Sequence, residues 1–179
     1  MTTNLFSDAH IYIRPFQSTD AKQFVDAVLE SLQTVGVYMP WAVPSYSIEN
    51  ALTWIDTCAT ARDTSTAYEF GIFRVGDDRL LGGCGLNQIN RSHNFCNLGY
   101  WVRECSQQRG IATKAIKLVA QYAFDELKFT RLEIVIAQMN IGSERAAQKS
   151  GALYECTARN RISDGPHLLA AKIYSLIPE

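Results

Sequence analysis

The hydrophobic pattern in the first third of the chain predicts one strand and two helices. Apolar residues alternate over residues 11–14 with the period of two that is typical of a strand, and Pro15 ends this segment. Apolar side chains then recur at helical spacing over residues 20–35 and again over residues 48–62. Ser47 precedes the second helix and is a suitable residue to cap its free N–H groups.

The middle of the chain changes to the alternating pattern of strands. Three strands are predicted, over residues 67–75, 80–90 and 95–102, with turns at residues 76–78 and 91–94. Gly82-Gly83-Cys84-Gly85 lies inside the second of these strands. It indicates a flexible or bulged strand and not a phosphate loop, because no Gly-Lys-Ser/Thr sequence and no helix follow it.

The last third of the chain contains the strongest helical pattern. A single apolar stripe predicts a long helix over residues 110–127. A strand, a short helix that stops at Gly151, and two final strands around the turn at residues 163–166 follow. These four elements are predicted over residues 131–137, 143–150, 152–159 and 167–176. The order of elements, without internal repeats, predicts one mixed α/β domain over residues 1–179.

The composition is that of an ordinary globular protein and excludes several other classes. The chain has 179 residues, of which 47% are hydrophobic and 20% charged, and its formal net charge is −1. These values give no basic surface for nucleic acid. No segment approaches the roughly 20 apolar residues that span a bilayer, and residues 1–10 lack the pattern of a signal peptide. We therefore expect a cytoplasmic protein that binds neither nucleic acid nor membranes.

The cysteines are odd in number and widely spaced, without any Cys-x-x-Cys pair. This arrangement favours free thiols in a reducing compartment over disulfides or a zinc site, and no metal is expected to bind. The five residues are Cys58, Cys84, Cys96, Cys105 and Cys156.

The most informative local sequence lies where the predicted strand 95–102 gives way to the long helix. Residues 107–112 read Gln-Gln-Arg-Gly-Ile-Ala, a Gln-x-x-Gly-x-Ala spacing. The first N–H groups of a helix have no partner within it, and the positive end of the helix dipole faces outwards, so together they bind phosphate groups. Gly110 allows close approach of a ligand, and Arg109 can add positive charge. The same sequence is also compatible with a simple loop-to-helix junction.

Several motifs, in the same order along the chain, resemble the GNAT acetyltransferase superfamily. Gly-Tyr-Trp-Val at residues 99–102, followed by the Gln-x-x-Gly-x-Ala sequence, is similar to its coenzyme motif. Asn-x-x-Ser at residues 140–143 and Lys-Ser-Gly-Ala at residues 149–152 resemble the ribosomal-protein N-terminal (RimJ/RimL-like) branch. Ile-Arg-Pro at residues 13–15 and Met-Pro-Trp at residues 39–41 are similar to that branch too, so the resemblance covers nearly the whole chain.

The resemblance implies a mixed, mainly antiparallel twisted sheet flanked by helices, in which strands 95–102 and 131–137 splay apart into a V. Acetyl-CoA is the implied cosubstrate, with its pantetheine arm in that gap. Asn140 is an implied coenzyme contact and Ser143 would lie near the thioester sulfur, although both residue types also cap helices. The other implied coenzyme-binding residues are Tyr100, Trp101, Val102, Gln108, Arg109, Gly110, Ile111, Ala112 and Thr113.

The implied reaction is direct attack of an amine on the acetyl thioester, without a protein nucleophile. The backbone N–H of Val102 is the family-like donor to the oxyanion. Ser143 is the candidate acid for the leaving thiolate, directly or through water, and Tyr154 is an alternative.

The general base is the part of this mechanism for which the sequence offers several candidates. Related enzymes often have a glutamate just before the Leu-Gly-Tyr-Trp segment, where this chain has Asn97, and an amide cannot act as a base. Forming a neutral amine at pH 7 costs roughly 4.6 kcal/mol for lysine but about 1–1.4 kcal/mol for an α-amino group. We therefore expect an α-amino acceptor, the N-terminus of a protein or peptide. Glu69 or His93 could supply a base from a neighbouring strand, although both are also typical surface residues.

The sequence leaves the acceptor and the oligomeric state open. Tyr38 and Trp41 either line an acceptor groove or anchor a loop between prolines. An enzyme that acetylates small-molecule amines, such as metabolites or antibiotics, is an alternative, and so is a non-catalytic sensor that only binds acyl-CoA. A monomer and a homodimer are both compatible with the sequence.

Overall fold

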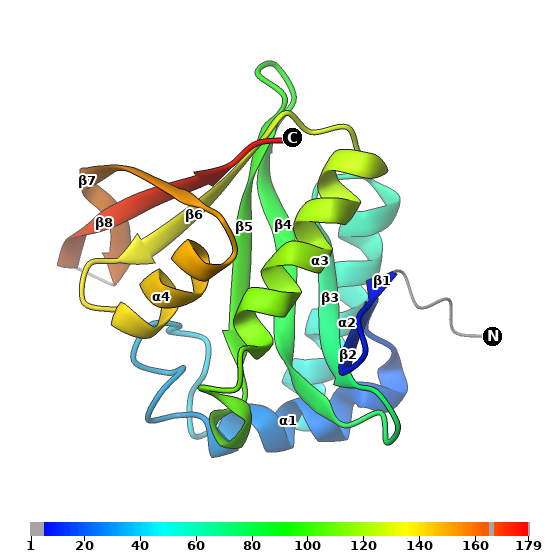
Figure 1. Ribbon diagram of the computed structural model, residues 1–179. Coiled ribbons are helices and arrows are strands. Elements are labelled where there is room, and N and C mark those ends of the chain that lie inside the picture. Colours follow the sequence, from blue (N-terminus) through cyan, green and yellow to red (C-terminus); the bar gives the residue numbers. More distant parts are fainter. Residues whose placement is uncertain (1–5, 165–166, 179) are drawn as a thin grey trace.

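The computed structural model describes residues 6–164 and 167–178, which form a sheet with helices on both faces (Figure 1). The strand order is β1-β2-β3-β4-β5-β6-β8-β7. Among the described residues, neighbouring strands are antiparallel except for β5 and β6. The predicted fold class is therefore confirmed. The strands are β1 (Phe6–Ser7), β2 (Ile11–Arg14), β3 (Tyr68–Arg74), β4 (Leu80–Asn90), β5 (Phe95–Val102), β6 (Arg131–Ala137), β7 (Leu153–Asp164) and β8 (His167–Leu176).

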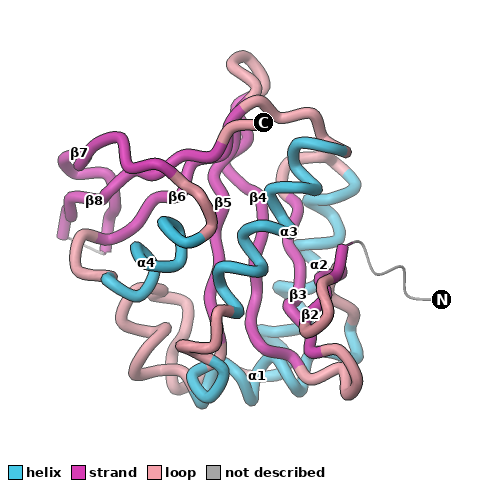
Figure 2. Tube along the Cα trace, viewed as in Figure 1, coloured by secondary structure: helices cyan, strands magenta, loops and turns pink. Residues whose placement is uncertain are grey.

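In the described part of the chain, two α-helices lie on each face of the sheet. Helices α3 and α4 lie on the face nearer the viewer in Figures 1 and 2, and α1 and α2 lie behind the sheet. Their bounds are Ala21–Glu30 for α1, Ile48–Asp63 for α2, Ile111–Asp125 for α3 and Ile141–Lys149 for α4.

Two hydrophobic clusters, one on each face of the sheet, pack the helices against the strands. Alternate residues of a strand point to opposite faces, so Phe70 packs with Ile116 of α3 while Phe73 packs with Phe24 of α1. All four side chains are buried. Burying one such side chain contributes about 1.5–3 kcal/mol, so both helical layers are held firmly against the sheet.

The sheet opens between β5 and β6. These strands pair only where residues 95–97 meet residues 131–133, and beyond that point they diverge (Figure 1). β6 then follows β8 as far as Ala137, whereas β5 follows β4 as far as Val102. The V-shaped gap that the family resemblance implied is therefore present.

The predicted helix over residues 20–35 is too long, because α1 ends at Glu30. Ser31 stops the regular pattern: its hydroxyl donates to the carbonyl of Ala27 at 2.6 Å, and its N–H donates to the carbonyl of Val28 at 3.0 Å. Consecutive turns follow, and they still bury Val35. The prediction was too long because apolar residues keep their helical spacing beyond Glu30, where the helix ends.

The second difference is at the C-terminal strand pair, where β7 runs to Asp164 instead of ending at residue 159. A register shift between Ala158 and Ile162, with Asn160 at a φ of 53°, forms a bulge that lets the polar segment stay in the sheet. The predicted turn includes residues 165–166, which lie outside the described residues.

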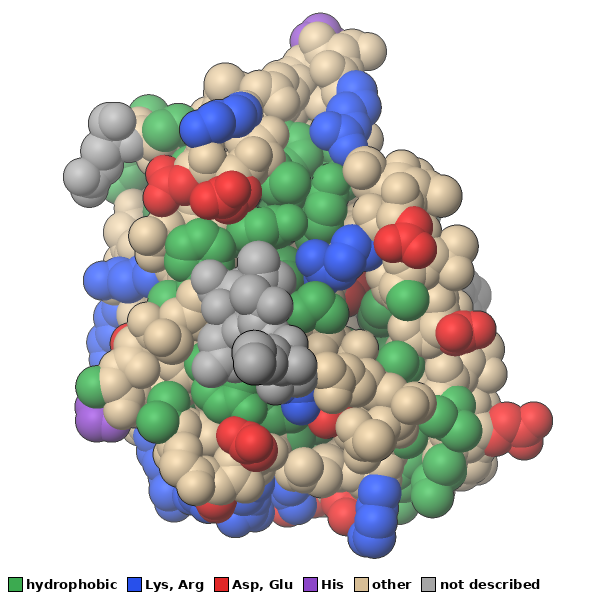
Figure 3. All heavy atoms as spheres, turned by 90° about the vertical axis from the view of Figure 1, so that its right-hand side faces the viewer, with side chains coloured by type: hydrophobic (Ala, Val, Ile, Leu, Met, Phe, Trp, Pro, Cys, Tyr) green, Lys and Arg blue, Asp and Glu red, His purple; other side chains and the backbone are tan. Residues whose placement is uncertain are grey.

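The other predicted elements agree with the structure to within a few residues. The glycine-rich segment of β4 is a bulged strand, as predicted: the register with β3 shifts beside Gly82. Strand β1 was not predicted. Among the described residues, no helix is long and apolar enough to cross a membrane. Positive and negative side chains are interspersed on the face shown in Figure 3, in line with the net charge of −1.

Candidate active site

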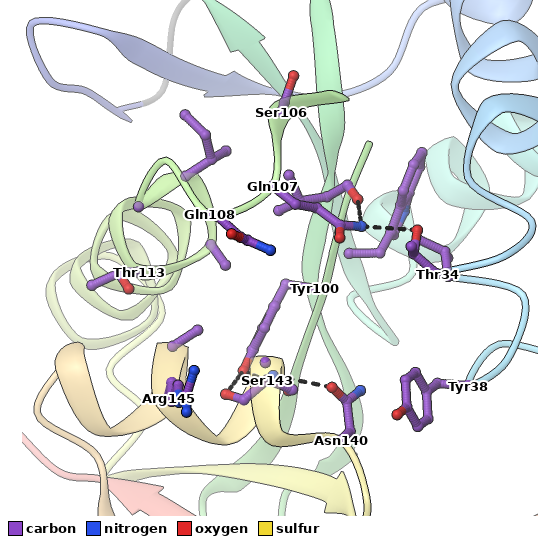
Figure 4. A pocket seen from close by; sticks show the side chains of 18 of the residues that line it. Thr34, Tyr38, Tyr100, Ser106, Gln107, Gln108, Thr113, Asn140, Ser143 and Arg145 are labelled. Carbon is purple, nitrogen blue, oxygen red and sulfur yellow. Dashed lines mark hydrogen bonds between the residues drawn. The ribbon is translucent and has the colours of Figure 1, made fainter. Parts of the chain in front are cut away.

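A cavity of about 580 Å³ lies where the N-terminus of α3, helix α4 and the segment after α1 meet at the open end of β5 (Figure 4). The structure brings together here most of the residues that the sequence predicted to bind the coenzyme. The predicted residues among its lining are Tyr38, Tyr100, Trp101, Val102, Gln108, Gly110, Ile111, Ala112, Thr113, Asn140 and Ser143.

The start of α3 has the geometry of an anion site. Gly110 caps the helix in the left-handed conformation with a φ of 77°, and Gln108 also has a positive φ of 60°. The backbone N–H of Lys114 donates to the carbonyl of Gly110 at 3.1 Å and is the first N–H bonded within the helix. Helix geometry therefore leaves the N–H groups of residues 111–113 without an intrahelical acceptor. A Cβ on Gly110 would meet nothing within 4 Å, so the approach to these N–H groups is open.

Two cations that the sequence interpretation missed line the opposite wall. Arg145 and Lys149 project from α4, four residues apart, and neither has an ion-pair partner among the described residues. Their i, i+4 spacing was visible in the sequence, but only the fold shows that they face α3. Arg109, which the sequence placed at the site, is exposed and does not line the cavity.

The end of β5 keeps a backbone N–H directed into the gap. The backbone N–H of Arg103 donates to the carbonyl of Leu81 at 2.8 Å and so points towards β4. Successive N–H groups of a strand point in opposite directions, so the N–H of Val102 points away from β4. The amide of Gln107 donates to the carbonyl of Val102 at 2.9 Å and to the hydroxyl of Thr34 at 3.0 Å. Gln107 thus ties the strand end to the loop after α1 (Figure 4).

Asn140 caps helix α4, whereas the hydroxyl of Ser143 does not. The side chain of Asn140 accepts the N–H of Ser143 at 3.1 Å and is the N-cap of α4. The hydroxyl of Ser143 instead lies 2.8 Å from the hydroxyl of Tyr100, which also donates to the Ser143 carbonyl at 2.9 Å. Burial raises the pKa of Tyr100 to about 12, against the opposing effect of Ser143, so Tyr100 is protonated at neutral pH.

Of the two aromatic candidates for an acceptor groove, one lines the cavity and the other does not. Tyr38 lines the cavity and donates to the carbonyl of Met139 at 3.2 Å. Trp41 does not line it and packs instead against Phe24 and Trp101, as a loop anchor would.

The alternative acid and one of the two possible bases lie on the surface, away from the cavity. Tyr154 is half exposed and bonds to Thr157, outside the lining. His93 lies in an exposed turn, also outside the lining.

Glu69 lies on β3, outside the cavity, and is partly buried. Asn87 donates to its carboxylate at 3.1 Å, and Asn97 donates in turn to Asn87 at 2.9 Å. Burial raises the pKa of Glu69 above its ordinary value, against the lowering effects of Asn87 and Arg62. No aspartate, glutamate or histidine lines the cavity in the described part of the chain.

All five cysteines are free, as predicted. Burial raises the pKa of Cys58 and of Cys96 to about 12, so these thiols are unreactive at neutral pH. Within residues 6–164 and 167–178, no three His, Cys, Asp or Glu side chains are arranged to hold a metal.

The splayed sheet and the open N–H groups at the start of α3 define a site that suits a phosphate-bearing ligand. The family model for the acetyltransferase (GNAT) domain matches residues 10–153. The chain therefore belongs to the GNAT family and is an acetyl-CoA-dependent N-acetyltransferase, as predicted.

The chain is similar over most of its length to several acetyltransferases. The probable N-acetyltransferase YjcK of Bacillus subtilis is 34% identical over 85% of each chain. A structure from Vibrio cholerae, described provisionally as a ribosomal-protein-serine acetyltransferase, is 28% identical, covers 99% of this chain and 100% of its own, and has a TM-score of 0.86. RimL, solved with coenzyme A, is 17% identical over 97% of each chain with a TM-score of 0.86. The sequence likeness to the Vibrio protein is in line with the predicted RimJ/RimL-like branch, and RimL shares the fold.

Proposed function

We propose that this enzyme transfers the acetyl group of acetyl-CoA to the α-amino group of a protein or peptide in the cytoplasm. The observation that carries the choice of acceptor is that the described lining of the cavity contains no carboxylate or histidine. Because no such group is part of this described lining, the rate depends on how readily the acceptor itself forms a neutral amine. An α-amino group with a pKa near 7.7–8.0 supplies far more neutral amine at pH 7 than a lysine near 10.4.

The relatives support the same acceptor. RimL is described as an α-N-protein acetyltransferase of ribosomal protein L7/L12, and the Vibrio protein is described as acting on a ribosomal protein. Five free cysteines support a reducing compartment.

The walls of the cavity suit the coenzyme. The N–H groups of residues 108–113 would hold the pyrophosphate, and Arg145 and Lys149 would add positive charge from the facing wall. Asn140 lies beside the gap in which the pantetheine arm would follow residues 100–102. Acetyl-CoA supplies the activated acetyl group as a thioester.

The reacting atoms would lie between β5 and α4. The N–H of Val102 would donate to the oxygen of the acetyl carbonyl as negative charge develops there. Ser143 would give a proton to the departing sulfur, and Tyr100, hydrogen-bonded to it, would hold the serine hydroxyl in place.

An acetyl-CoA turnover assay with a panel of peptides and small amines tests this proposal. We expect release of free CoA with peptides that have an open N-terminus. CoA binding without turnover of any amine would favour the acyl-CoA sensor, and turnover of small amines alone would favour a metabolite or antibiotic acetyltransferase.

A further inference from the structure

A chain of three polar side chains crosses the sheet on the face of α1 and α2. Glu69, Asn87 and Asn97 lie on the neighbouring strands β3, β4 and β5 and are joined by hydrogen bonds of 3.1 and 2.9 Å. The last of them pairs with Glu133 at the position where β5 and β6 cease to pair. The chain therefore leads from a carboxylate to the edge of the V-shaped gap.

Two glycines lie on the strands between this carboxylate and the gap, where a side chain would otherwise stand over the sheet. The register places Glu69 beside Gly85 and Gly85 beside Gly99, in one row across three strands. The carboxylate lies over Gly85, in the space that a Cβ there would need. A Cβ on Gly99 would meet only the side-chain nitrogens of Asn87 and Asn97, at 3.8 and 3.9 Å.

Burial raises the pKa of Glu69 against the opposing charge of Arg62, but no described cation is in direct contact with the carboxylate. It forms no ion pair among the described residues. Arg62 of α2 donates at 2.8 Å to the backbone carbonyl of Glu69, not to its carboxylate. Buried carboxylates are usually paired with a cation, so a partly buried one that forms no ion pair is a candidate for chemistry.

The groups around Glu69 leave it as the available base. Arg62 and Asp63 of α2 and Cys58 of the same helix line a cavity of about 110 Å³ with it. Burial raises the pKa of Cys58 to about 12 and also raises that of Cys84 on β4. Both thiols are therefore already protonated at neutral pH and cannot accept another proton. Burial likewise raises the pKa of Glu69 above its ordinary 4.5, which brings it nearer to that of an α-amino group.

We propose that Glu69 is the general base of this enzyme and that Asn87 and Asn97 are positioning residues that direct its carboxylate and the acceptor ammonium towards each other. This inference rests on the proposed function. The ammonium gives one proton to the Glu69 carboxylate, directly or through one water molecule. The freed lone pair forms the bond to the acetyl carbon, and the carbon–sulfur bond breaks. The departing sulfur takes a proton from Ser143, and the second proton that the nitrogen loses replaces it on Ser143. Glu69 then returns its proton to solvent.

The acceptor preference is unchanged by this assignment. The free-energy cost of a neutral amine at a given pH depends on the amine alone, whichever group takes the proton. A carboxylate on β3, two strands away from β5, lowers the kinetic barrier for an α-amino group without making lysine an easy substrate.

The test compares Glu69→Gln with Asp63→Asn, a neighbouring carboxylate on α2 that serves as the matched control. We expect kcat/KM of Glu69→Gln for a peptide with a free N-terminus to fall on the order of 100-fold at pH 6, with CoA affinity unchanged. The deficit should shrink as the pH approaches about 8, where the amine loses its proton unaided. Asp63→Asn should follow the wild type throughout.

A second variant tests the positioning role through a shift in the pH profile. Asn87→Ala removes the hydrogen bond that lowers the pKa of Glu69, so the acidic limb of the kcat/KM profile should move to higher pH. Glu69→Gln activity equal to that of Asp63→Asn, or an unmoved limb in Asn87→Ala, would overturn this inference alone. A wild type that binds CoA but acetylates no amine would overturn the proposed function and this inference with it.

Discussion

Gly110 combines two properties at the residue scale, a left-handed backbone and an unobstructed approach to the helix start. Gly110→Asp would place a negative charge where the pyrophosphate should lie. We expect CoA affinity to fall at least about 100-fold, because like charges near 4 Å apart at a protein surface repel by about 4 kcal/mol. Gly110→Asn is the matched control, since asparagine tolerates the left-handed region and carries no charge. Calorimetric titration with CoA showing equal affinities for the two variants would remove the phosphate assignment.

Ser143 has a hydroxyl that is not used to cap a helix, because Asn140 holds that role. Ser143→Ala should therefore lower kcat by about 100-fold with little change in CoA affinity or in thermal stability. The readout is steady-state kinetics beside a thermal melt. Tyr100→Phe, which keeps the serine, should reduce kcat less. A kcat of Ser143→Ala within about twofold of the wild type would end the proposal that Ser143 is the acid.

At the scale of elements, α4 depends on its cap. Asn140→Ala removes the acceptor for the Ser143 N–H and should cost about 1 kcal/mol of unfolding free energy, measured by urea denaturation. Asn140→Asp is the control, because aspartate caps equally well and its charge suits a helix N-terminus. Equal stability of the alanine and aspartate variants would show that the cap contributes nothing.

Helix α1 is joined to the segment before α3 by a pH-sensitive contact. Glu30 accepts from Arg103 at 2.7 Å and from the N–H of Cys105 at 3.0 Å, and the Arg103 hydrogen bond is the main reason that the pKa of Glu30 is lowered to about 2. A lowered pKa in the folded state stabilises the protein above the ordinary pKa near 4.5, and this stabilisation is lost as the pH falls towards 2.

Glu30→Gln should therefore destabilise the protein by about 1–2 kcal/mol at pH 7, after allowance for its partial exposure, and by nearly nothing close to pH 2. Urea denaturation at both pH values measures the difference. The control is Asp26→Asn, which breaks an exposed pair with Lys22 and should cost less than about 0.5 kcal/mol. A Glu30→Gln deficit that is the same at both pH values would contradict the assignment.

Local sequence predicted the elements well where one residue decides the local geometry. The apolar stripe predicted the start of α3 at Gly110, and in the structure this glycine has the positive φ that few other residues adopt. The end of α1 was missed because Ser31 acts through hydrogen bonds to the preceding turn, which apolar spacing does not record. Neither Arg145 nor the contact of Glu69 with Asn87 was predictable, since both depend on which elements the fold brings together.

At the scale of the whole molecule, the opening between β5 and β6 is the feature that relates the two halves of the site. The coenzyme cavity lies at the open end of β5, between α3 and α4, and the Glu69 row approaches the same gap on the face of α1 and α2. An amine and a thioester can therefore meet in the gap from different sides. The proposed acetyl transfer to an α-amino group would take place in this gap.

The most direct test of this proposed transfer is the rate of CoA release with two matched peptides. One has a free N-terminus and no lysine, and the other has a blocked N-terminus and one free lysine. The costs of forming the two neutral amines differ by more than about 3 kcal/mol at pH 7, so the first peptide should react at least about 100 times faster. Equal rates for the two peptides would contradict the assignment of an α-amino acceptor.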